Sequence, residues 1–145
     1  MVGFVLTGHG MFAPGLASAA SMIAGQLDEF DVVPFKEEEA GGYPEKIASV
    51  IADSAKRNEG VIVLCDLMGG TPFNQSMMAS QNCENVEVVA GANLPMLLEV
   101  LSTRAPESTV DELVECCLEA GKMGVAHVAL DEDDASEDEG EEDGI

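Results

Sequence analysis

Basic residues are scarce in this sequence. Of 145 residues, six are Lys or Arg and 28 are Asp or Glu, so the formal net charge is -22. Many of the carboxylates fall between Asp131 and Asp143, but residues 1–130 are acidic without them. Nucleic-acid binding requires clustered Lys and Arg side chains that displace counterions, and an anionic membrane surface would repel this chain. We therefore expect neither nucleic acid nor a membrane surface as a direct partner.

Long apolar runs are missing as well. The sequence has no uninterrupted apolar stretch of the length that spans a bilayer, and the first basic residue is Lys36, so we expect neither a transmembrane helix nor a secretory signal. No Cys-x-x-Cys pair occurs among the four cysteines, which are Cys65, Cys83, Cys116 and Cys117. We interpret them as reduced, structural residues. Together these features predict a cytoplasmic protein.

The loops that bind nucleotides are also absent. The sequence contains no Gly-x4-Gly-Lys-Ser/Thr loop and no Gly-x-Gly-x-x-Gly loop, so it offers nothing to hold a triphosphate and its metal ion. His9, Asp66, His127 and the cysteines do not have the spacing of metal ligands. We expect no metal and no cofactor, and we interpret His127 as a structural residue.

The sequence does contain an alternation of strand and helix patterns. Residues 2–6 and 61–65 are unbroken apolar runs, which are typical of strands buried on both faces of a parallel sheet. Residues 30–35 and 86–90 are weaker strand candidates, and apolar residues at helical spacing lie between the strands. The alternation predicts an α/β fold for residues 1–130, with a doubly wound, open and mainly parallel sheet. We expect the strand order 2-1-3-4, in which the first and third strands are neighbours.

Two segments near the end of the chain have patterns of their own. Residues 125–130 are apolar and indicate a short last strand. Residues 131–145 have no apolar periodicity, and most of them are acidic. Because such a segment repels itself and buries little apolar surface, we expect a disordered acidic tail.

The residues suited to chemistry follow the first and third strands. The first strand ends in Thr7-Gly8-His9-Gly10, and Asp66 follows the third. Ligands of doubly wound sheets bind where the strand order reverses, so His9 and Asp66 should meet there. A carboxylate that accepts one imidazole N–H fixes the tautomer and leaves the other nitrogen free to attack. We interpret His9 as a nucleophile, which its glycine neighbours leave accessible; the alternative is a histidine that merely ends a strand.

A glycine-rich turn comes shortly after Asp66. The segment Gly69-Gly70-Thr71-Pro72 is typical of a helix start, with Thr71 as the N-cap and Pro72 at the first helical position. The unpaired N–H groups and partial positive charge of a helix N-terminus suit one phosphate-sized anion. An ordinary capped helix is the alternative. Beside His9, the turn predicts a single phosphoryl group as ligand, with a further cation supplied by an Arg of a partner.

Three motifs resemble those of the mannose-family enzyme IIA (EIIA) of the bacterial sugar phosphotransferase system (PTS). In order, they are His9-Gly10, residues 66–74 (DLMGGTPFN) and residues 91–99 (GANLPMLLE). The resemblance implies that residues 1–130 are an EIIA domain in which His9 accepts a phosphoryl group from the phosphocarrier protein HPr and passes it to a IIB domain. It also implies that Asp66 hydrogen-bonds the His9 ring and that the phosphate is received by Gly69, Gly70 and Thr71.

The resemblance further implies the assembly around this chain. The IIB domain phosphorylates sugar that enters through the membrane subunits IIC and IID, so contact with the membrane is indirect, and no metal or nucleotide takes part. Members of the family are homodimers that exchange the last strand, which here is residues 125–130. Because an acidic tail stands where many relatives continue into IIB, we expect the IIB acceptor to be a separate protein.

Two positions depart from the family pattern. Met68 stands where relatives often carry an aromatic residue, and Thr71 stands where they often carry Ser. Met11 and Met68 follow the two site loops, and they either form a docking rim for partners or fill the core. Two further functions are alternatives to a sugar-uptake relay: the phosphoryl-donor subunit of a dihydroxyacetone kinase, and a non-catalytic regulatory module phosphorylated at His9 as a signal.

Overall fold

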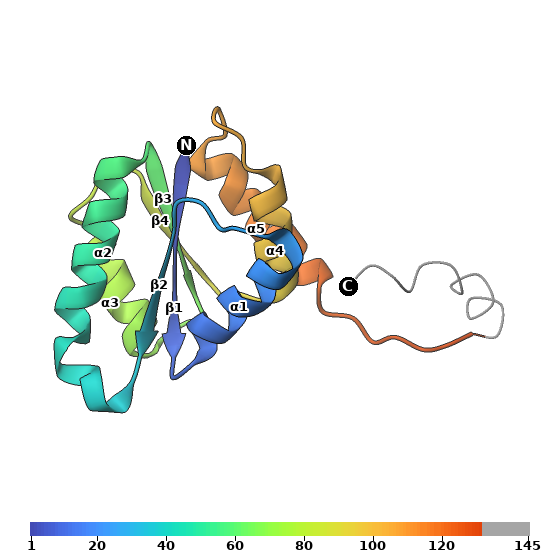
Figure 1. The fold of residues 1–145 in the computed structure, drawn as a ribbon, viewed down its shortest axis with the longest axis horizontal. Helices are drawn as coiled ribbons and strands as arrows, with labels where there is room; N and C mark the ends of the chain where they lie inside the picture. Colours follow the sequence, from blue (N-terminus) through green and yellow to red (C-terminus); the bar gives the residue numbers. More distant parts are fainter. Residues whose placement is uncertain (132–145) are drawn as a thin grey trace.

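A computed structural model describes residues 1–131 and shows a single parallel sheet between two layers of helices (Figure 1). The strand order is β2-β1-β3-β4, and each neighbouring pair is parallel. The strands are β1 (Val2–His9), β2 (Phe30–Phe35), β3 (Gly60–Cys65) and β4 (Val86–Ala90). The predicted fold class and strand order are therefore confirmed.

Helices cover both faces of this sheet. On one face lie α1 (Phe12–Ala24), α4 (Leu94–Thr103) and α5 (Val110–Met123), and on the other lie α2 (Tyr43–Arg57) and α3 (Gly70–Ser80) (Figure 1). A short 3-10 helix, η1 (Glu37–Gly42), leads from β2 into α2. Each face thus has its own hydrophobic core.

The two central strands are buried on both sides. In β1, Phe4 and Leu6 point into the core beneath α1, α4 and α5, whereas Val5 points into the core beneath α2 and α3. All residues of β3 are buried. Burying an apolar side chain of this size contributes roughly 1.5–3 kcal/mol, so neither side of these strands tolerates alternating polar residues. This explains their unbroken apolar sequences.

Side-chain caps fix the starts of α4 and α5. The Asn93 carboxamide oxygen accepts from the Met96 backbone N–H at 3.0 Å, and its NH2 group donates to the carbonyl of Gly121 in α5. At α5, Thr109 and Glu112 form a reciprocal capping box. The two helices are therefore capped and tied to each other, which gives that side of the sheet a rigid cover.

The predicted start of α3 is wrong. The helix begins at Gly70 with Gly69 as its N-cap, so Thr71 is not the cap and Pro72 is not the first helical residue. Gly69 and Gly70 have φ values of +89° and +79°. Only glycine adopts this region without strain, so the pair lets the chain turn into the helix earlier than the Thr-Pro pattern indicates.

The chain leaves the body of the fold after α5 (Figure 1). The predicted last strand, residues 125–130, does not form in the single chain, because a strand needs a hydrogen-bonded neighbour and this segment is exposed. Its apolar side chains Val125, Val128 and Leu130 are 79%, 81% and 86% exposed. The predicted acidic tail, residues 131–145, lies outside the described residues except for Asp131.

All four cysteines are free thiols. Burial raises the pKa of Cys65 to about 11 and that of Cys117 to about 12, so both stay protonated at neutral pH. Protonated, buried thiols are poor nucleophiles, which is consistent with a structural role. None of the helices within residues 1–131 has the length and apolar character needed to cross a membrane.

Candidate functional site

His9 and Asp66 lie side by side at the carboxyl edge of the sheet. The register of β1 and β3 pairs Thr7 with Cys65, which brings the residues that follow them together. Nδ1 of His9 is 2.7 Å from Oδ2 of Asp66, and the backbone N–H of His9 donates to the same oxygen at 3.0 Å. The structure therefore brings together the two residues that the sequence predicts to meet.

Asp66 determines which nitrogen of His9 carries the proton. Burial raises the pKa of Asp66, but hydrogen bonds from the backbone and ring of His9 and from the backbone N–H of Leu67 outweigh it, so this pKa lies below its usual value. An ionised carboxylate can only accept hydrogen bonds, so the short contact is Nδ1–H donating to Oδ2. In the neutral ring Nε2 then holds the lone pair.

The two side chains differ in exposure. Asp66 is 10% exposed and His9 is 48% exposed. The carboxylate therefore lies behind the imidazole, and a molecule arriving from solvent meets the ring first. A partner can reach the ring without disturbing the hydrogen bond that orients it.

Gly8 makes room for Asp66. A Cβ atom on Gly8 would lie 3.0 Å from Cβ and Cγ of Asp66 and 2.6 Å from Cδ1 of Phe12. By contrast, a Cβ on Gly10 would meet open space, and the φ of Gly10 is +56°. Gly8 is thus needed for the close approach of β1 to Asp66 and Phe12, and Gly10 for the backbone turn. Neither glycine is present simply to keep His9 accessible, as the sequence had indicated.

The start of α3 lies near the other edge of the imidazole. A Cβ atom on Gly70 would lie 3.1 Å from Cε1 and 3.4 Å from Nε2 of His9. The first backbone N–H groups of a helix have no partner within it and carry a partial positive charge. Gly70 is the residue of this turn that lies beside Nε2, and Gly69 and Thr71 are its neighbours in the chain. Pro72 has no N–H to offer.

Sequence reasoning missed an aromatic side chain that contacts the ring. Phe35 is the Cα partner of His9 across β1 and β2. The two ring centroids are 5.7 Å apart, with the planes at 75°. Tyr43 packs against Phe35, with the ring centroids 4.8 Å apart. The register could have revealed Phe35, because directly paired residues of parallel strands point to the same face, but the pattern alone does not give the register.

The remaining predicted residues separate into two groups. Met11 and Met68 are 62% and 78% exposed, so the core-filling alternative for them is wrong. Leu67, which precedes Met68, is 49% exposed, and we call these three exposed apolar side chains on the loops after β1 and β3 the apolar rim. His127 lies on the exposed segment after α5, and the structure does not bring it to the pair. Across residues 1–131, no group of three or more His, Cys, Asp or Glu side chains could hold a metal ion.

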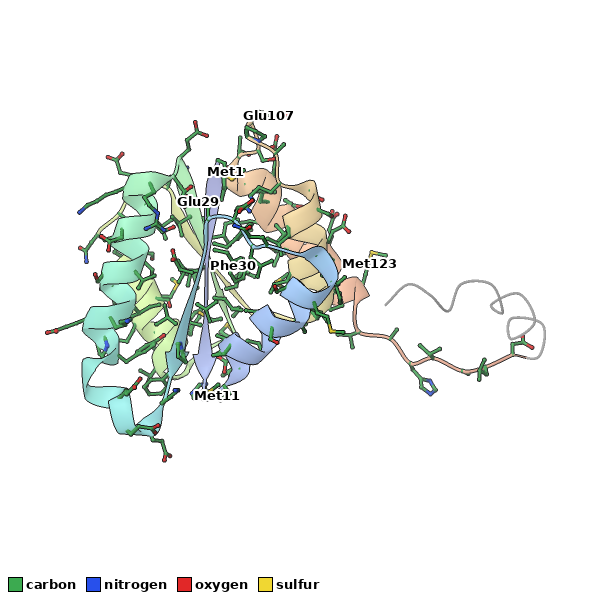
Figure 2. The ribbon with its side chains drawn as sticks, viewed as in Figure 1. Met1, Met11, Glu29, Phe30, Glu107 and Met123 are labelled. Carbon is green, nitrogen blue, oxygen red and sulfur yellow. The ribbon has the colours of Figure 1, made fainter. Side chains whose placement is uncertain are left out.

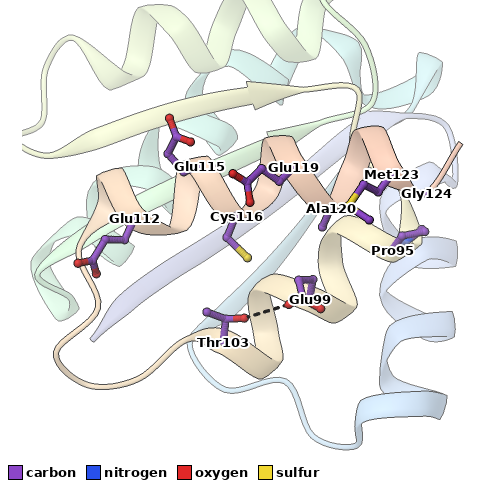
Figure 3. A pocket seen from close by; sticks show the side chains of 10 residues that line it. All are labelled: Pro95, Glu99, Thr103, Glu112, Glu115, Cys116, Glu119, Ala120, Met123 and Gly124. Carbon is purple, nitrogen blue, oxygen red and sulfur yellow. Dashed lines mark hydrogen bonds between the residues drawn. The ribbon is translucent and has the colours of Figure 1, made fainter.

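Cavities occur both beside this site and away from it. A cavity of about 390 Å³ adjoins the site and is lined by Gly10, Met11, Lys36, Glu37 and Glu38. A larger one, of about 610 Å³, lies between α4 and α5 (Figure 3). Glutamates from both helices edge it, and Cys116 faces into it. Because none of its lining residues belongs to the His9 site, its size does not bear on the chemistry there.

Residues 3–118 match the EIIA-man family, described as the PTS system fructose IIA component. The chain belongs to this family. It is 34% identical over 125 residues to the PTS system mannose-specific EIIAB component of Escherichia coli, covering 86% of this chain and 38% of that protein. The chain thus spans well under half of that relative. It is 36% identical over 105 residues to the PTS system fructose-specific EIIA component of Bacillus subtilis, covering 72% of this chain and 71% of that protein.

Solved EIIA structures have the same fold. The mannose/sorbose specific IIA subunit of the phosphotransferase system from Enterococcus faecalis has a TM-score of 0.80 at 32% identity, covering 90% of this chain and 96% of that chain. The phosphotransferase system component EIIA from Streptococcus agalactiae has a TM-score of 0.77 at 29% identity, covering 88% and 97%. The predicted resemblance to the EIIA family is confirmed.

Proposed function

We propose that this EIIA protein accepts a phosphoryl group on Nε2 of His9 and passes it to a second protein. The observation that carries the proposal is the 2.7 Å contact between Nδ1 of His9 and Oδ2 of Asp66, because it leaves Nε2 as the nucleophilic nitrogen of a half-exposed ring. In this proposal Asp66 orients the ring, and the phosphate is bound by Gly69, Gly70 and Thr71.

The transfer is balanced without a further reactant. The lone pair of Nε2 attacks the phosphorus of a phosphohistidine on the donor and forms the new N–P bond. The N–P bond of the donor breaks, and its electron pair stays on the donor's ring nitrogen. The proton on Nδ1 remains there, and the Asp66 carboxylate stabilises the positive charge that develops on the ring. Reversal of these steps delivers the group to the acceptor.

The partners in this proposal are HPr as donor and a IIB domain or subunit as acceptor. The exposed apolar rim of Met11, Leu67 and Met68 supports docking beside His9, since thioethers adapt to differently shaped partners. Sugar would be phosphorylated by IIB as it enters through IIC and IID, so this chain would work in the cytoplasm and touch the membrane only through its partners. In this scheme no cofactor is used.

A homodimer is part of the proposal. The strand β4 lies at one edge of the sheet. Residues 125–130 are apolar and exposed, which suits a strand that pairs with that edge in a second copy. The expected mass in solution is that of two chains, measured by light scattering. A single-chain mass would contradict this part of the proposal and leave the chemistry at His9 unaffected.

The function is tested by phosphorylation with enzyme I, HPr and labelled phosphoenolpyruvate. The chain contains two histidines, His9 and His127, which supply a matched pair of variants. The wild type and His127→Ala should each take up one label that is stable in alkali and labile in acid. His9→Ala should take up none, because it lacks the Nε2 atom that accepts the phosphoryl group. It should keep the fold, because the ring that is removed is exposed. Label on His9→Ala would refute the assignment.

The acceptor is identified by adding partners to the labelled protein. Rapid, reversible transfer to a IIB protein supports the sugar-uptake relay. Transfer to dihydroxyacetone kinase subunits instead would assign the chain to that enzyme. A label that neither acceptor removes would indicate a regulatory module that is phosphorylated as a signal.

A further inference from the structure

The hydrogen bond to Asp66 does not by itself fix the plane of the His9 ring. The imidazole turns about its Cα–Cβ and Cβ–Cγ bonds, and one N–H···O contact leaves part of this rotation open because a hydrogen bond tolerates a range of distances and angles. Gly70 has no side chain to hold the ring, although a Cβ atom there would meet its Cε1–Nε2 edge. The aromatic ring of Phe35 lies at 75° to the imidazole, with the centroids 5.7 Å apart. This T-shaped contact restricts the rotation that the hydrogen bond leaves open.

The backbone holds Phe35 in register with His9. The two residues are Cα partners at the ends of β2 and β1. The backbone N–H of Gly10 then donates to the carbonyl of Phe35 at 2.7 Å. The two strand ends are therefore joined where the rings meet, and the aromatic ring cannot shift along the strand relative to the imidazole.

Behind Phe35, the ring of Tyr43 is anchored in the core. Tyr43 is 3% exposed. The Thr7 hydroxyl donates its single proton to the Val33 carbonyl at 2.7 Å, so in the 2.6 Å contact between Tyr43 and Thr7 the tyrosine O–H must donate. Burial raises the pKa of Tyr43 to about 12, which keeps this donor protonated at neutral pH. Tyr43 is thus fixed at its hydroxyl and packs against Phe35 with its ring.

We propose that Phe35 is a positioning residue for phosphoryl transfer: supported by Tyr43 and Thr7, it holds the imidazole plane so that Nε2 faces the start of α3. This inference rests on the proposed function of His9. Phe35 takes no part in bond making, and its effect is exerted through the orientation of the nucleophile. Misplacing a reacting atom by about 1 Å can cost roughly 100-fold in rate, so a loosened ring should transfer slowly.

The test compares Phe35→Leu with Phe30→Leu. Phe30 lies on the same strand but packs against Phe4 in the core on the other face, with the centroids 6.2 Å apart. We expect Phe35→Leu to lower kcat for transfer from phosphorylated HPr by about 10- to 100-fold with a smaller change in KM. Phe30→Leu should transfer at the wild-type rate per folded molecule. Phe35→Tyr keeps an aromatic ring and should restore most of the rate.

A second measurement does not depend on transfer. Nitrogen NMR of isotope-labelled imidazole reports the tautomer and mobility of the His9 ring. We expect a fixed ring protonated at Nδ1 in the wild type and Phe30→Leu, and a more mobile ring with a mixed tautomer in Phe35→Leu. If Phe35→Leu fails to fold, Tyr43→Phe replaces it. Loss of the hydroxyl that hydrogen-bonds Thr7 should loosen the Tyr43 ring and the Phe35 ring that it supports. Transfer should then slow a few-fold, which corresponds to about 1 kcal/mol.

The outcomes for Phe35 and for the proposed function differ. Unchanged rates and unchanged imidazole spectra in Phe35→Leu, or in Tyr43→Phe where it replaces that variant, would overturn the positioning role. A wild-type protein that takes up no label would overturn the function instead. The NMR comparison would then still decide whether Phe35 orients the ring.

Discussion

The two ends of the sheet both carry charged side chains but use them differently. Figure 2 shows Met1 and Glu29 at the amino end of the strands and Met11 at the opposite end. At the amino end Arg57 donates to Glu29 at 3.3 Å and to Asp31 at 2.9 Å. All three of these side chains are between a third and a half exposed. At the carboxyl end a largely buried carboxylate holds an open imidazole.

The amino-end cluster distributes its hydrogen bonds among several partners. Glu29 also accepts from the Asn58 carboxamide at 3.0 Å. Because water screens exposed ion pairs, such a cluster contributes little to stability. The carboxyl end instead uses one of the two ring nitrogens of His9 and turns the other toward the start of α3. An oriented imidazole with one unused nitrogen is therefore typical of a reactive site, whereas a shared network of exposed charges is typical of a solvated surface.

The largest effect should come from removing the carboxylate of Asp66. Asp66→Asn keeps the size of the side chain but no longer stabilises the positive ring, and it can accept from or donate to Nδ1. We expect transfer from HPr to slow by about 10²- to 10⁴-fold with the fold retained. Asp31→Asn is the matched change at the amino end and should leave the rate unchanged. Equal rates for both variants would show that Asp66 has another role.

A smaller effect should come from crowding the unused nitrogen. Gly70→Ala places a methyl group 3.1 Å from Cε1 and 3.4 Å from Nε2 of His9, and it also strains a backbone with φ of +79°. Gly25 has φ of +82° and open space around it, so Gly25→Ala introduces the backbone strain without crowding a neighbour. We expect a loss of transfer rate of about 10- to 100-fold for Gly70→Ala and no loss for Gly25→Ala, measured per folded molecule.

The smallest effect should be on the pH dependence of the free energy of unfolding. The folded-state pKa of Asp66 is lowered, so its contribution to stability is present above the unfolded pKa of about 4 and is lost as pH falls through the lower folded value. The wild type should therefore be more stable than Asp66→Asn at neutral pH, and this advantage should shrink below about pH 4. Denaturant unfolding at several pH values measures it.

The amino end provides the comparison for this titration. Hydrogen bonds from Asn58 and Arg57 lower the pKa of Glu29. The stability advantage of the wild type over Glu29→Gln should therefore also shrink as the pH falls. The effect of Glu29→Gln should be smaller than that of Asp66→Asn, because Glu29 is 36% exposed whereas Asp66 is 10% exposed. If the wild type stays more stable than Asp66→Asn by the same amount down to strongly acid pH, the lowered pKa of Asp66 would be contradicted.

Much of the fold follows from patterns that are local in the sequence. The bounds of β2 and β4 agree with the predicted residues 30–35 and 86–90. The meeting of His9 and Asp66 was also predictable, because parallel strands of successive units end at the same edge of a sheet. By contrast, the start of α3 was wrong because the positive φ values of Gly69 and Gly70 carry no periodic signal.

The residues missed at the site share one property. Phe35 and Tyr43 look like ordinary core residues in sequence, and Gly8 looks like a flexible neighbour of His9. Their roles depend on which residue of one strand lies opposite which residue of the next, and on how closely two loops approach. Such information comes from packing between segments far apart in the chain.

The sequence alone determined the fold class and the two residues at the centre of the candidate site, because apolar periodicity and strand-end motifs reflect burial that each segment must achieve. Only the tertiary structure decided how the imidazole is held. The 2.7 Å contact to Asp66, the aromatic contact with Phe35 and the space that Gly8 leaves arise where β1, β2 and β3 pack in register. Distances of this kind are set jointly by several segments, and no single segment encodes them.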